Sequence, residues 1–410
     1  MMGQKKDALP VAETQQDRLA LAAIGMEAEF VLLLDDRPTR PEDVYGSPLG
    51  FIRRQLMHRR GTSYHLPNGG AIYFDTGVIE VATPVIEIER GCAARAGRNL
   101  WEGIHFVRDE LDAWQERDGR RARLSGFSTH YNISFDAPVR HDPRRTVHKL
   151  ALLLTYILPA PVMLLAANRR STGVGVRPRG DRVEITVDFT PSAALMVATG
   201  AAITGIVRDV MTWDSFELDE LEKHRLPTFA AFHPVPHTSR HGWLARYSSY
   251  ASNPFAADVD DAMWRTSDGR TRSLRDIARD IVRHFAPSIR RIADPFTFRF
   301  IQRVMSGRAP SLLDLDDRPP EYDDVGHACV WEELFPRRWV NHSRYERVLI
   351  RAIAGQRLEL FQRWYTPVAM KGWSSVVFRR DDDRTRHTFP IDFLLAHLGR
   401  WDGRRTRVRA

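Results

Sequence analysis

Apolar and polar positions alternate along several segments in the first part of the chain, a pattern that predicts strands. Between them, apolar residues recur at spacings of three and four, which predicts helices. The expected strands cover residues 22–34, 71–74, 77–85, 123–135 and 182–189. The expected helices cover residues 49–60, 92–117, 143–167 and 191–213. The sequence therefore predicts an α+β protein that combines a sheet with helices.

The pattern changes after about residue 288. Helical periodicity at 289–305 and 345–364 predicts a smaller, mostly helical C-terminal region, and the Pro- and Asp-rich residues 306–321 are expected to form a loop. We therefore expect three parts: a flexible N-terminal lead at residues 1–18, a catalytic domain at 19–288 and a smaller C-terminal domain at 289–410.

Two uncharged stretches, residues 150–167 and 190–207, are long and apolar. A membrane-spanning helix needs about 20 apolar residues, so we expect buried core helices instead. The N-terminus lacks the apolar segment of a secretion signal. Cys92 and Cys329 fit neither a metal motif nor a disulfide framework. These features predict a soluble, cytoplasmic protein without a membrane partner.

The chain is basic, with a formal net charge of +8. A positive surface would suit an acidic protein or peptide. The alternative is that the arginines are spread evenly over the surface, which gives the same net charge without a binding patch. No run reaches the five or six like charges of a nucleic-acid-binding tail. We therefore expect no nucleic-acid partner.

Glu27 and Glu29 interrupt an otherwise apolar strand. Alternate strand residues point to the same face, roughly 6.5–7 Å apart, so the two carboxylates share a face. Inward-facing carboxylates need a positive partner, and divalent Mg²⁺ or Mn²⁺ would provide one. A surface strand that buries Met26, Ala28 and Phe30 on its other face is the alternative.

Two further pairs of polar residues lie on expected strands. Asp75 and Glu80 follow the turn signal at residues 68–70, at positions that active-site carboxylates favour, although Asp is also common in turns. His130 and Asn132 share one face of the next strand. The imidazole could bind a metal or a phosphate oxygen, or it could only be hydrogen-bonded within the fold.

An arginine-rich segment precedes Glu184. Guanidinium groups stabilise the charge of a transferring phosphoryl group, and a solvated basic hairpin is the alternative. The candidate phosphate contacts are Arg177, Arg179, Arg182, Arg240 and Arg246.

The order of these segments resembles the glutamine synthetase and glutamate–cysteine ligase superfamily, and among its members the Pup ligase and depupylase family. Residues 25–30 (GMEAEF) look like that family's G-x-E-x-E-F strand. Residues 68–84 (NGGAIYFDTGVIEVATP) are similar to its N-G-A-R-x-Y-x-D…P-E-Y-x-T-P segment. Residues 128–132 (STHYN) resemble its S-H-x-N strand. Residues 184–192 (EITVDFTPS) resemble the E-x-R-x-P-D-P-S segment of glutamine synthetases.

The resemblance implies a glutamine-synthetase-like antiparallel β-sheet cradle packed on helices, with ATP and Mg²⁺ (or Mn²⁺) as cofactors. The implied metal ligands are Glu27, Glu29, Glu80, His130 and Glu184. Asn132 and the five arginines would contact the ATP phosphates, and Asp75 would be the catalytic base. The sequence departs from the synthetases at Thr186, where they carry Arg, so a phosphate-binding arginine would come from Arg177, Arg179 or Arg182.

The resemblance implies an ATP- and Mg²⁺-dependent carboxylate–amine ligase that forms an amide or isopeptide bond through an acyl phosphate. Its partners would be a carboxylate donor and an amine acceptor, and a small acidic protein tag is one candidate. A depupylase-like amide hydrolase that uses the same ATP site is the first alternative. A non-catalytic binding protein is the second, because a fold alone does not fix function.

Overall fold

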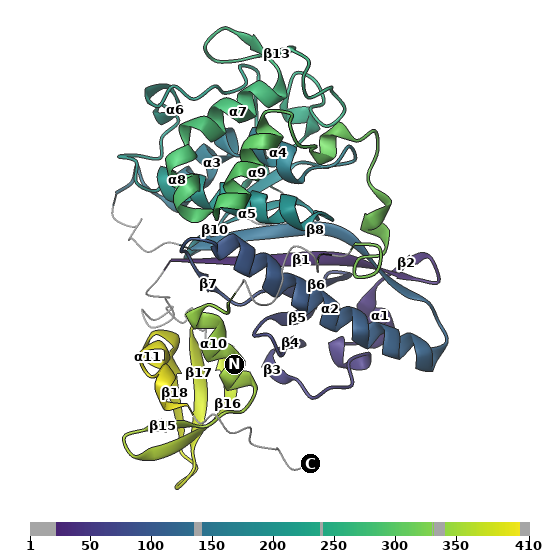
Figure 1. Ribbon diagram of the computed structural model, residues 1–410, viewed down its shortest axis with the longest axis vertical. Coiled ribbons are helices and arrows are strands. Elements are labelled where there is room, and N and C mark those ends of the chain that lie inside the picture. The colour runs from purple at the N-terminus through teal and green to yellow at the C-terminus, as the bar shows by residue number, and fades with distance from the viewer. Residues whose placement is uncertain (1–21, 135–141, 238–240, 330, 332–340, 402–410) are drawn as a thin grey trace, which may run out of the picture.

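The computed structural model describes residues 22–134, 142–237, 241–329, 331 and 341–401. In this part, the chain forms a large sheet, a layer of helices upon it and a C-terminal unit with its own sheet (Figure 1). The predicted α+β class is confirmed. The expected lead at residues 1–18 and Arg240 lie outside the described residues.

The large sheet has twelve strands among the described residues, and all its pairings are antiparallel. Its order is β11-β12-β9-β10-β8-β1-β6-β5-β4-β3, with β2 and β7 paired to β1. The strands are β1 (Ala23–Leu34), β2 (Arg37–Thr39), β3 (Met57–Arg60), β4 (Ser63–His65), β5 (Ala71–Asp75), β6 (Val78–Ala82), β7 (Ile86–Glu87), β8 (Ala122–Ser134), β9 (Val174–Pro178), β10 (Arg182–Asp188), β11 (Val235–Pro236) and β12 (Trp243–Ala245).

The central strand β1 shows how the sequence assigns the two faces of this sheet. Met26, Ala28 and Phe30 are fully buried, whereas the alternating Glu27 and Glu29 are only partly buried. Because side chains alternate between faces, the apolar set packs into the core and both glutamates project from the opposite face.

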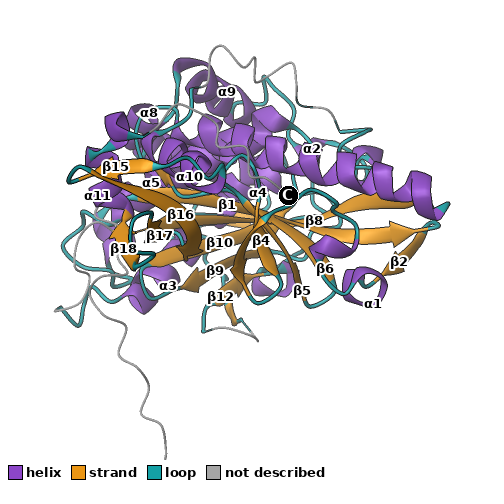
Figure 2. Ribbon diagram, turned by 90° about the horizontal axis from the view of Figure 1, so that it is seen from below, coloured by secondary structure: helices purple, strands orange, loops and turns teal. Residues whose placement is uncertain are grey.

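Helices cover the apolar face of the sheet, and in Figure 2 α2, α8 and α9 lie on the same side of the strands. A Cβ added at Gly200 would lie 3.4 Å from Ala93 and 3.5 Å from the Tyr131 ring, so α5 approaches both α2 and β8 closely. The helices of the main domain are α1 (Pro41–Tyr45), α2 (Cys92–Asp118), α3 (Val147–Ile157), α4 (Pro159–Ala166), α5 (Ala193–Val210), α6 (Glu220–Lys223), α7 (Leu274–His284), α8 (Ala286–Ile292) and α9 (Pro295–Met305).

The two long apolar stretches form core helices, as expected. Helix α5 is long and apolar enough to cross a membrane, but 83% of it is buried inside the structure. The single helix expected at 143–167 is instead two helices, α3 and α4, bent by 63°. Pro159 and Pro161 lack the backbone N–H that would continue the hydrogen-bond ladder, so the helix breaks there.

Two predicted helices are wrong in part. Residues 49–60 contain strand β3, in which Met57 pairs with His65 of β4, so tertiary pairing overrides the local helical pattern. Residues 345–364 begin as helix α10 (Arg344–Ile353) but then enter strand β15 (Leu358–Leu360). Gly355, with φ of +69°, lies between the two elements.

The C-terminal unit, residues 341–401, is not mostly helical. It contains a four-stranded sheet of β15, β16 (Arg363–Lys371), β17 (Ser375–Arg380) and β18 (Arg386–Pro390), together with α10 and α11 (Ile391–Ala396). Its buried residues form a cluster separate from the main core, which extends to Trp331. Residues of α8 and α9 also pack into the main core, which thus extends past residue 288, and the domain bounds 19–288 and 289–410 stay a prediction.

Buried polar contacts join the C-terminal unit to the main domain. Glu346, which is fully buried, forms an ion pair with Arg98 of α2 and accepts a hydrogen bond of 3.1 Å from Asn99 Nδ2. The amide of Tyr345 donates to Glu87 Oε1 at 3.1 Å. Helix α10 is thus fixed against α2 and β7.

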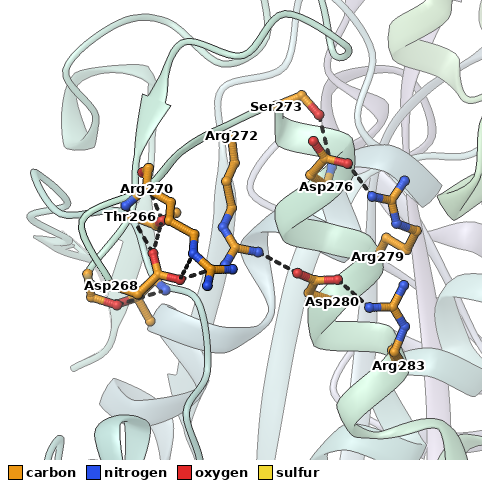
Figure 3. A network of polar contacts seen from close by, with 11 residues as sticks. Thr266, Asp268, Arg270, Arg272, Ser273, Asp276, Arg279, Asp280 and Arg283 are labelled. Atoms are coloured by element: carbon orange, nitrogen blue, oxygen red, sulfur yellow. Dashed lines mark hydrogen bonds and ion pairs between the residues drawn. The ribbon is translucent and has the colours of Figure 1, made fainter.

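Many of the arginines are paired with nearby acids, and Figure 3 shows one such network. Arg272 bridges Asp268 of the β13 (Trp264–Arg265) to β14 (Thr271–Arg272) hairpin and Asp280 of α7. Asp280 also pairs with Arg283 at 2.8 Å. These charges fix the hairpin to α7, so part of the basic composition serves the fold.

Candidate active site

The antiparallel register gathers the predicted acidic residues on the face of the sheet opposite the core. Glu27 of β1 pairs with His130 of β8, and Glu29 pairs with Ser128 of β8 on one side and with Glu80 of β6 on the other. The odd-numbered glutamates of β1 therefore face their polar partners across adjacent strands.

Three of these side chains converge. Ligand atoms of Glu27, Glu80 and His130 all lie within 4.8 Å of one another. Glu80 is 3% exposed and His130 is 7% exposed, so two members of this triad are buried. The structure thus brings together three of the five metal ligands that the sequence predicted.

Neighbouring groups hold the triad in place. Tyr73 donates a hydrogen bond from its hydroxyl to Glu80. His130 Nδ1 lies 3.4 Å from Glu27 Oε2, and His130 Nε2 lies 3.6 Å from Glu29 Oε1. Ser128 in turn donates to Glu29. Glu29, the fourth predicted ligand, is therefore beside the triad and is bound to Ser128.

The electrostatics of the triad favour a bound cation. Burial and the negative charge of Glu27 raise the pKa of Glu80. Burial alone would also raise the pKa of Glu27, but the hydrogen bond and charge of His130 outweigh it and lower this pKa. Two carboxylates held together in a buried site repel each other unless a positive charge separates them. A pair of carboxylates with one imidazole is a donor set that Mg²⁺ or Mn²⁺ can use.

Glu184, the fifth predicted ligand, has other partners. Arg177 forms an ion pair with its carboxylate, and Arg179 donates to Oε2 from Nε at 2.9 Å and from Nη2 at 2.7 Å. This geometry differs from the expected metal contact, because Glu184 lies across the ladder from Arg177 on β9, where two guanidinium groups neutralise it. The contacts of Glu184 are those of a residue that holds Arg177 and Arg179 in position.

The other predicted phosphate contacts divide into two groups. Arg182 Nε donates to Asn132 Oδ1 at 2.8 Å, and Arg177 Nη2 lies 3.5 Å from His130 Nε2. Arg177, Arg182 and Asn132 therefore lie next to the triad, on the side where β8 pairs with β10. Arg246 instead lies over the ring of Tyr247, 5.0 Å from its centre, and donates to its hydroxyl. The structure does not bring the Arg246 side chain to the triad.

Asp75 is placed by the tight hairpin between β5 and β6. Thr76 and Gly77 have φ of +49° and +99°, and positive φ at both central residues is what a type I′ turn requires. Asp75 pairs with Val78 at the end of the ladder, and the Gly77 amide donates to Glu42 Oε1 at 2.9 Å. Asp75 therefore occupies the last position of a fixed strand, half-buried, near the Glu80 carboxylate.

A cavity of about 770 Å³ adjoins these residues. Its wall includes Glu29, Asp75, His130, Arg177 and Asp188. The predicted base, two predicted ligands and one predicted phosphate-binding arginine thus line a common space that is large enough for a small substrate.

Some residues of the site were not predicted. Tyr73 and Ser128 lie within the motifs already noted, and the period of two along their strands could have identified them, because Tyr73 shares a face with Asp75 and Ser128 with His130. Arg59 also lies near the triad, but its segment was predicted to be a helix, so no sequence pattern indicated this position.

No known protein family and no curated protein matches the chain by sequence. Solved structures do match it. A complex between the prokaryotic ubiquitin-like protein Pup and its ligase PafA has a TM-score of 0.51 and 10% sequence identity, over 94% of each chain. The Pup ligase PafA in complex with ADP has a TM-score of 0.41 and 10% identity, over 83% of this chain and 90% of that one. The chain therefore has a fold similar to that of the Pup ligase PafA, as the resemblance implied.

Proposed function

We propose that this protein is an ATP- and Mg²⁺-dependent carboxylate–amine ligase. The observation that carries this proposal is the Glu27–Glu80–His130 triad, which lies beside Asp75 on the open face of the sheet. Buried acidic clusters of this kind are costly unless they serve a cation.

The triad would hold the metal ion, and Glu29 is close enough to assist. When bound, Mg²⁺ or Mn²⁺ supplies positive charge to the phosphate oxygens of ATP. Arg177 lines the cavity and Arg179 lies next to it on Glu184, so both guanidinium groups are pre-oriented toward the same region. Asn132 and Arg182 extend this polar surface along β8 and β10.

The reaction requires two displacements. An oxygen of the substrate carboxylate attacks the γ-phosphorus of ATP, and ADP leaves, which gives an acyl phosphate. The nitrogen of an amine then attacks the acyl carbon, and phosphate leaves as the amide forms. The attacking amine must lose a proton, and Asp75 on the cavity wall is the group that would accept it.

The carboxylate donor and amine acceptor are proposed by class only. In one of the matching structures Pup is bound to its ligase, and we extend this to a small acidic protein or peptide as a candidate donor here. The net charge of +8 would speed the encounter with such a partner. We propose that the protein is located in the cytoplasm.

An amide hydrolase is the second candidate. Asp75 lines an open cavity together with Glu29 and Ser128, so water can reach its carboxylate. In that reaction Asp75 would activate water against an amide or isopeptide carbonyl, and ATP would not be consumed stoichiometrically.

The experiment is a measurement of ADP release with Mg²⁺ against a panel of amino acids, peptides and small acidic proteins. We expect release that requires both a carboxylate and an amine and that falls at least about 100-fold in Glu27→Gln. Glu116→Gln, an exposed change on α2, is the matched control. Amide cleavage without stoichiometric ADP would favour the hydrolase, and no binding of nucleotide would exclude both candidates.

A further inference from the structure

The wall of the cavity includes a carboxylate to which the proposed reaction gives no role. Asp188 is the last residue of β10 and pairs with Ser128 of β8, which pairs with Glu29 of β1. Residues that are directly opposite in a ladder share a face, so Asp188 projects from the same face of the sheet as Glu29. Two strand spacings, about 10 Å along the sheet, separate these two residues. Asp188 thus belongs to the candidate site but lies outside the triad.

The hydrogen-bond partners of Asp188 are neutral in the part of the chain that the structure describes. Its Oδ2 accepts from the amide of Asn168 at 2.9 Å and from Asn168 Nδ2 at 3.0 Å. Ser171 is a further partner, and Arg318 acts on the carboxylate from a distance but pairs with Asp323 at 2.6 Å. Burial raises the pKa of Asp188 to about 6. Its charged form therefore has no bound counter-ion.

The arginines that line the cavity are already neutralised. Each of them pairs with an acid that is not part of the cavity wall. These pairs are Arg170–Asp317, Arg177–Glu184 and Arg318–Asp323. Their positive charges are thus balanced without Asp188, and a half-buried carboxylate that lacks an ion pair is stabilised by a cation. The position therefore favours a positively charged group of a ligand.

Phe127 reaches the cavity because β8 contains a bulge. Gly126 and Ser128 pair with consecutive residues of β1, which leaves Phe127 as the extra residue. The Phe189 amide donates to the Phe127 carbonyl at 3.2 Å, and a Cβ added at Gly126 would lie 2.4 Å from the Phe189 ring, so the bulge is closely packed. The Phe127 side chain is 57% exposed and lines the cavity. Since Phe189 follows Asp188 in the chain, this aromatic ring belongs to the same part of the site as the unpaired carboxylate.

The apolar part of the wall indicates which kind of cation fits. Val31, Leu33 and Leu244 also line the cavity and are only half-buried. An alkylammonium group would use all of these surfaces, because its charge pairs with the carboxylate and is attracted to the aromatic face, while its methylene groups cover aliphatic side chains. A metal ion would need several oxygen ligands and would leave the apolar walls uncovered. The composition of the wall therefore favours an alkylammonium ligand.

This ammonium group is not the amine that reacts. The proposed base, Asp75, is on β5, and the strand order β10-β8-β1-β6-β5 places it four strand spacings from Asp188. That separation is about 19 Å along the sheet. We therefore assign the two carboxylates to different groups of the substrates: Asp75 to the attacking amine and Asp188 to a second, unreactive charge.

We propose that Asp188 and Phe127 form a subsite for a primary alkylammonium group that a substrate carries in addition to its reacting group. This inference rests on the proposed function for the two substrates. The ammonium group belongs either to the carboxylate donor, as in an amino acid, or to the amine acceptor, as in a diamine, and the subsite would recognise both by the same chemistry. Asp188 and Phe127 would then determine specificity without taking part in bond formation.

The first test is calorimetric titration of the full chain with pentylamine at pH 7.5, where this amine is an ammonium ion, in the presence of Mg²⁺ and without ATP. We expect Asp188→Asn to weaken binding at least about tenfold and Phe127→Leu to weaken it about twofold to fivefold. Pentanol, the neutral analogue, should bind equally to wild type and Asp188→Asn. The matched controls are Asp109→Asn, an exposed change on α2, and Phe296→Leu, at a ring on α9 that is 56% exposed.

Three results of this titration would overturn the inference and leave the ligase proposal standing. They are equal affinity in wild type and Asp188→Asn, no binding by wild type, and binding that is lost only in Glu27→Gln, because the ammonium group would then occupy the triad. Thermal unfolding identifies any variant that fails to fold. If Asp188→Asn does, Phe127→Leu, at an exposed position, carries the test.

The second test measures ATP turnover and identifies the substrate that carries the ammonium group. Asp188→Asn should raise the KM, with kcat nearly unchanged, either for amino acids but not for carboxylates that lack the ammonium group, or for diamines but not for monoamines. The first result assigns the group to the donor and the second to the acceptor. Unchanged KM values in both comparisons, or a fall in kcat alone, would overturn the inference. Pentylamine binding that needs Asp188, without any ATP turnover, would support the subsite and reject the proposed function.

Discussion

The hydroxyl of Tyr73 on β5 donates a hydrogen bond to Glu80 on the adjacent strand β6. The two residues are directly opposite in the ladder, so one cross-strand pair fixes the orientation of a carboxylate that belongs to the triad. Hydrogen bonds from the groups that surround metal ligands commonly set how well those ligands bind.

Tyr73→Phe should therefore weaken Mn²⁺ binding about 10-fold while the fold is retained, because the ring stays and only the hydroxyl is lost. Calorimetry with Mn²⁺ measures this change. Tyr64→Phe, on the neighbouring strand β4, is the control and should bind as wild type does. Equal affinity in wild type and Tyr73→Phe would show that this bond does not position the ligand.

Metal binding should stabilise the protein. At a free Mn²⁺ concentration 100 times the dissociation constant, the free energy of unfolding should rise by about 2.7 kcal/mol, since the ion binds only the folded state. The rise should disappear with EDTA and in Glu80→Gln, but persist in Glu116→Gln. Thermal unfolding with and without the ion measures it. A rise of the same size in Glu80→Gln would place the ion elsewhere.

His65 should make the protein sensitive to mild acid. It is fully buried, and burial together with the charges of Arg59 and His58 lowers its pKa from 6.5 to about 4. Between these values the unfolded chain binds a proton that the folded chain does not. Stability should therefore fall as the pH drops from 6.5 to 4, by up to about 3 kcal/mol from this residue.

The measurement for His65 is urea unfolding at pH 7.5 and pH 4.5. His65→Gln should lose less stability than wild type between these two conditions. His233→Gln, a change at an exposed histidine that does not act on the pKa of His65, should behave as wild type does. If His65→Gln and wild type lose the same amount, His65 is not the buried group responsible.

The ion pair between Arg98 and Glu346 should be important for docking of the C-terminal unit. Glu346→Gln keeps the hydrogen-bond acceptor of its helix cap but removes the buried charge, so that Glu102, at 3.0 Å, is the one acidic partner left to Arg98 among the described residues. We expect a loss of up to about 3 kcal/mol in the free energy of unfolding. Guanidinium denaturation measures it, with the exposed Glu321→Gln as control. A paired Arg98→Met and Glu346→Leu change should recover most of the loss, and failure to recover would contradict this account.

The structure could be predicted from the sequence where a short-range pattern of residues determines it. The alternation of apolar and acidic residues along β1 fixed which face carries Glu27 and Glu29, and the order of strands brought Glu80 and His130 to the same place. The turn residues Thr76 and Gly77 explain the position of Asp75.

The parts of the fold that could not be predicted from the sequence depend on pairing between strands that are far apart in the chain. Strand β3 forms because Met57 and His58 pair with β4, and only this pairing brings Arg59 to the site. The ion pairs of Glu184 with Arg177 and Arg179 depend on the β9–β10 register, which local patterns leave open. The C-terminal sheet was missed because the helical periodicity of α10 continued, by chance, into β15 and β16.

Trapping of the activated carboxylate with hydroxylamine tests whether the protein forms an acyl phosphate. Acyl phosphates react with it to give hydroxamates, which are measured together with ADP across a panel of carboxylates. Hydroxylamine, unlike an alkyl ammonium ion, is already unprotonated at neutral pH. Asp75→Asn should therefore keep hydroxamate formation but lose ligation of an alkyl amine at least about 100-fold, with Asp109→Asn on the exposed side of α2 as control.

A ligase should produce hydroxamate and ADP in equal amounts as wild type, and neither product as Glu27→Gln. Amide cleavage by wild type, with no hydroxamate that depends on ATP for any carboxylate, would contradict the ligase proposal.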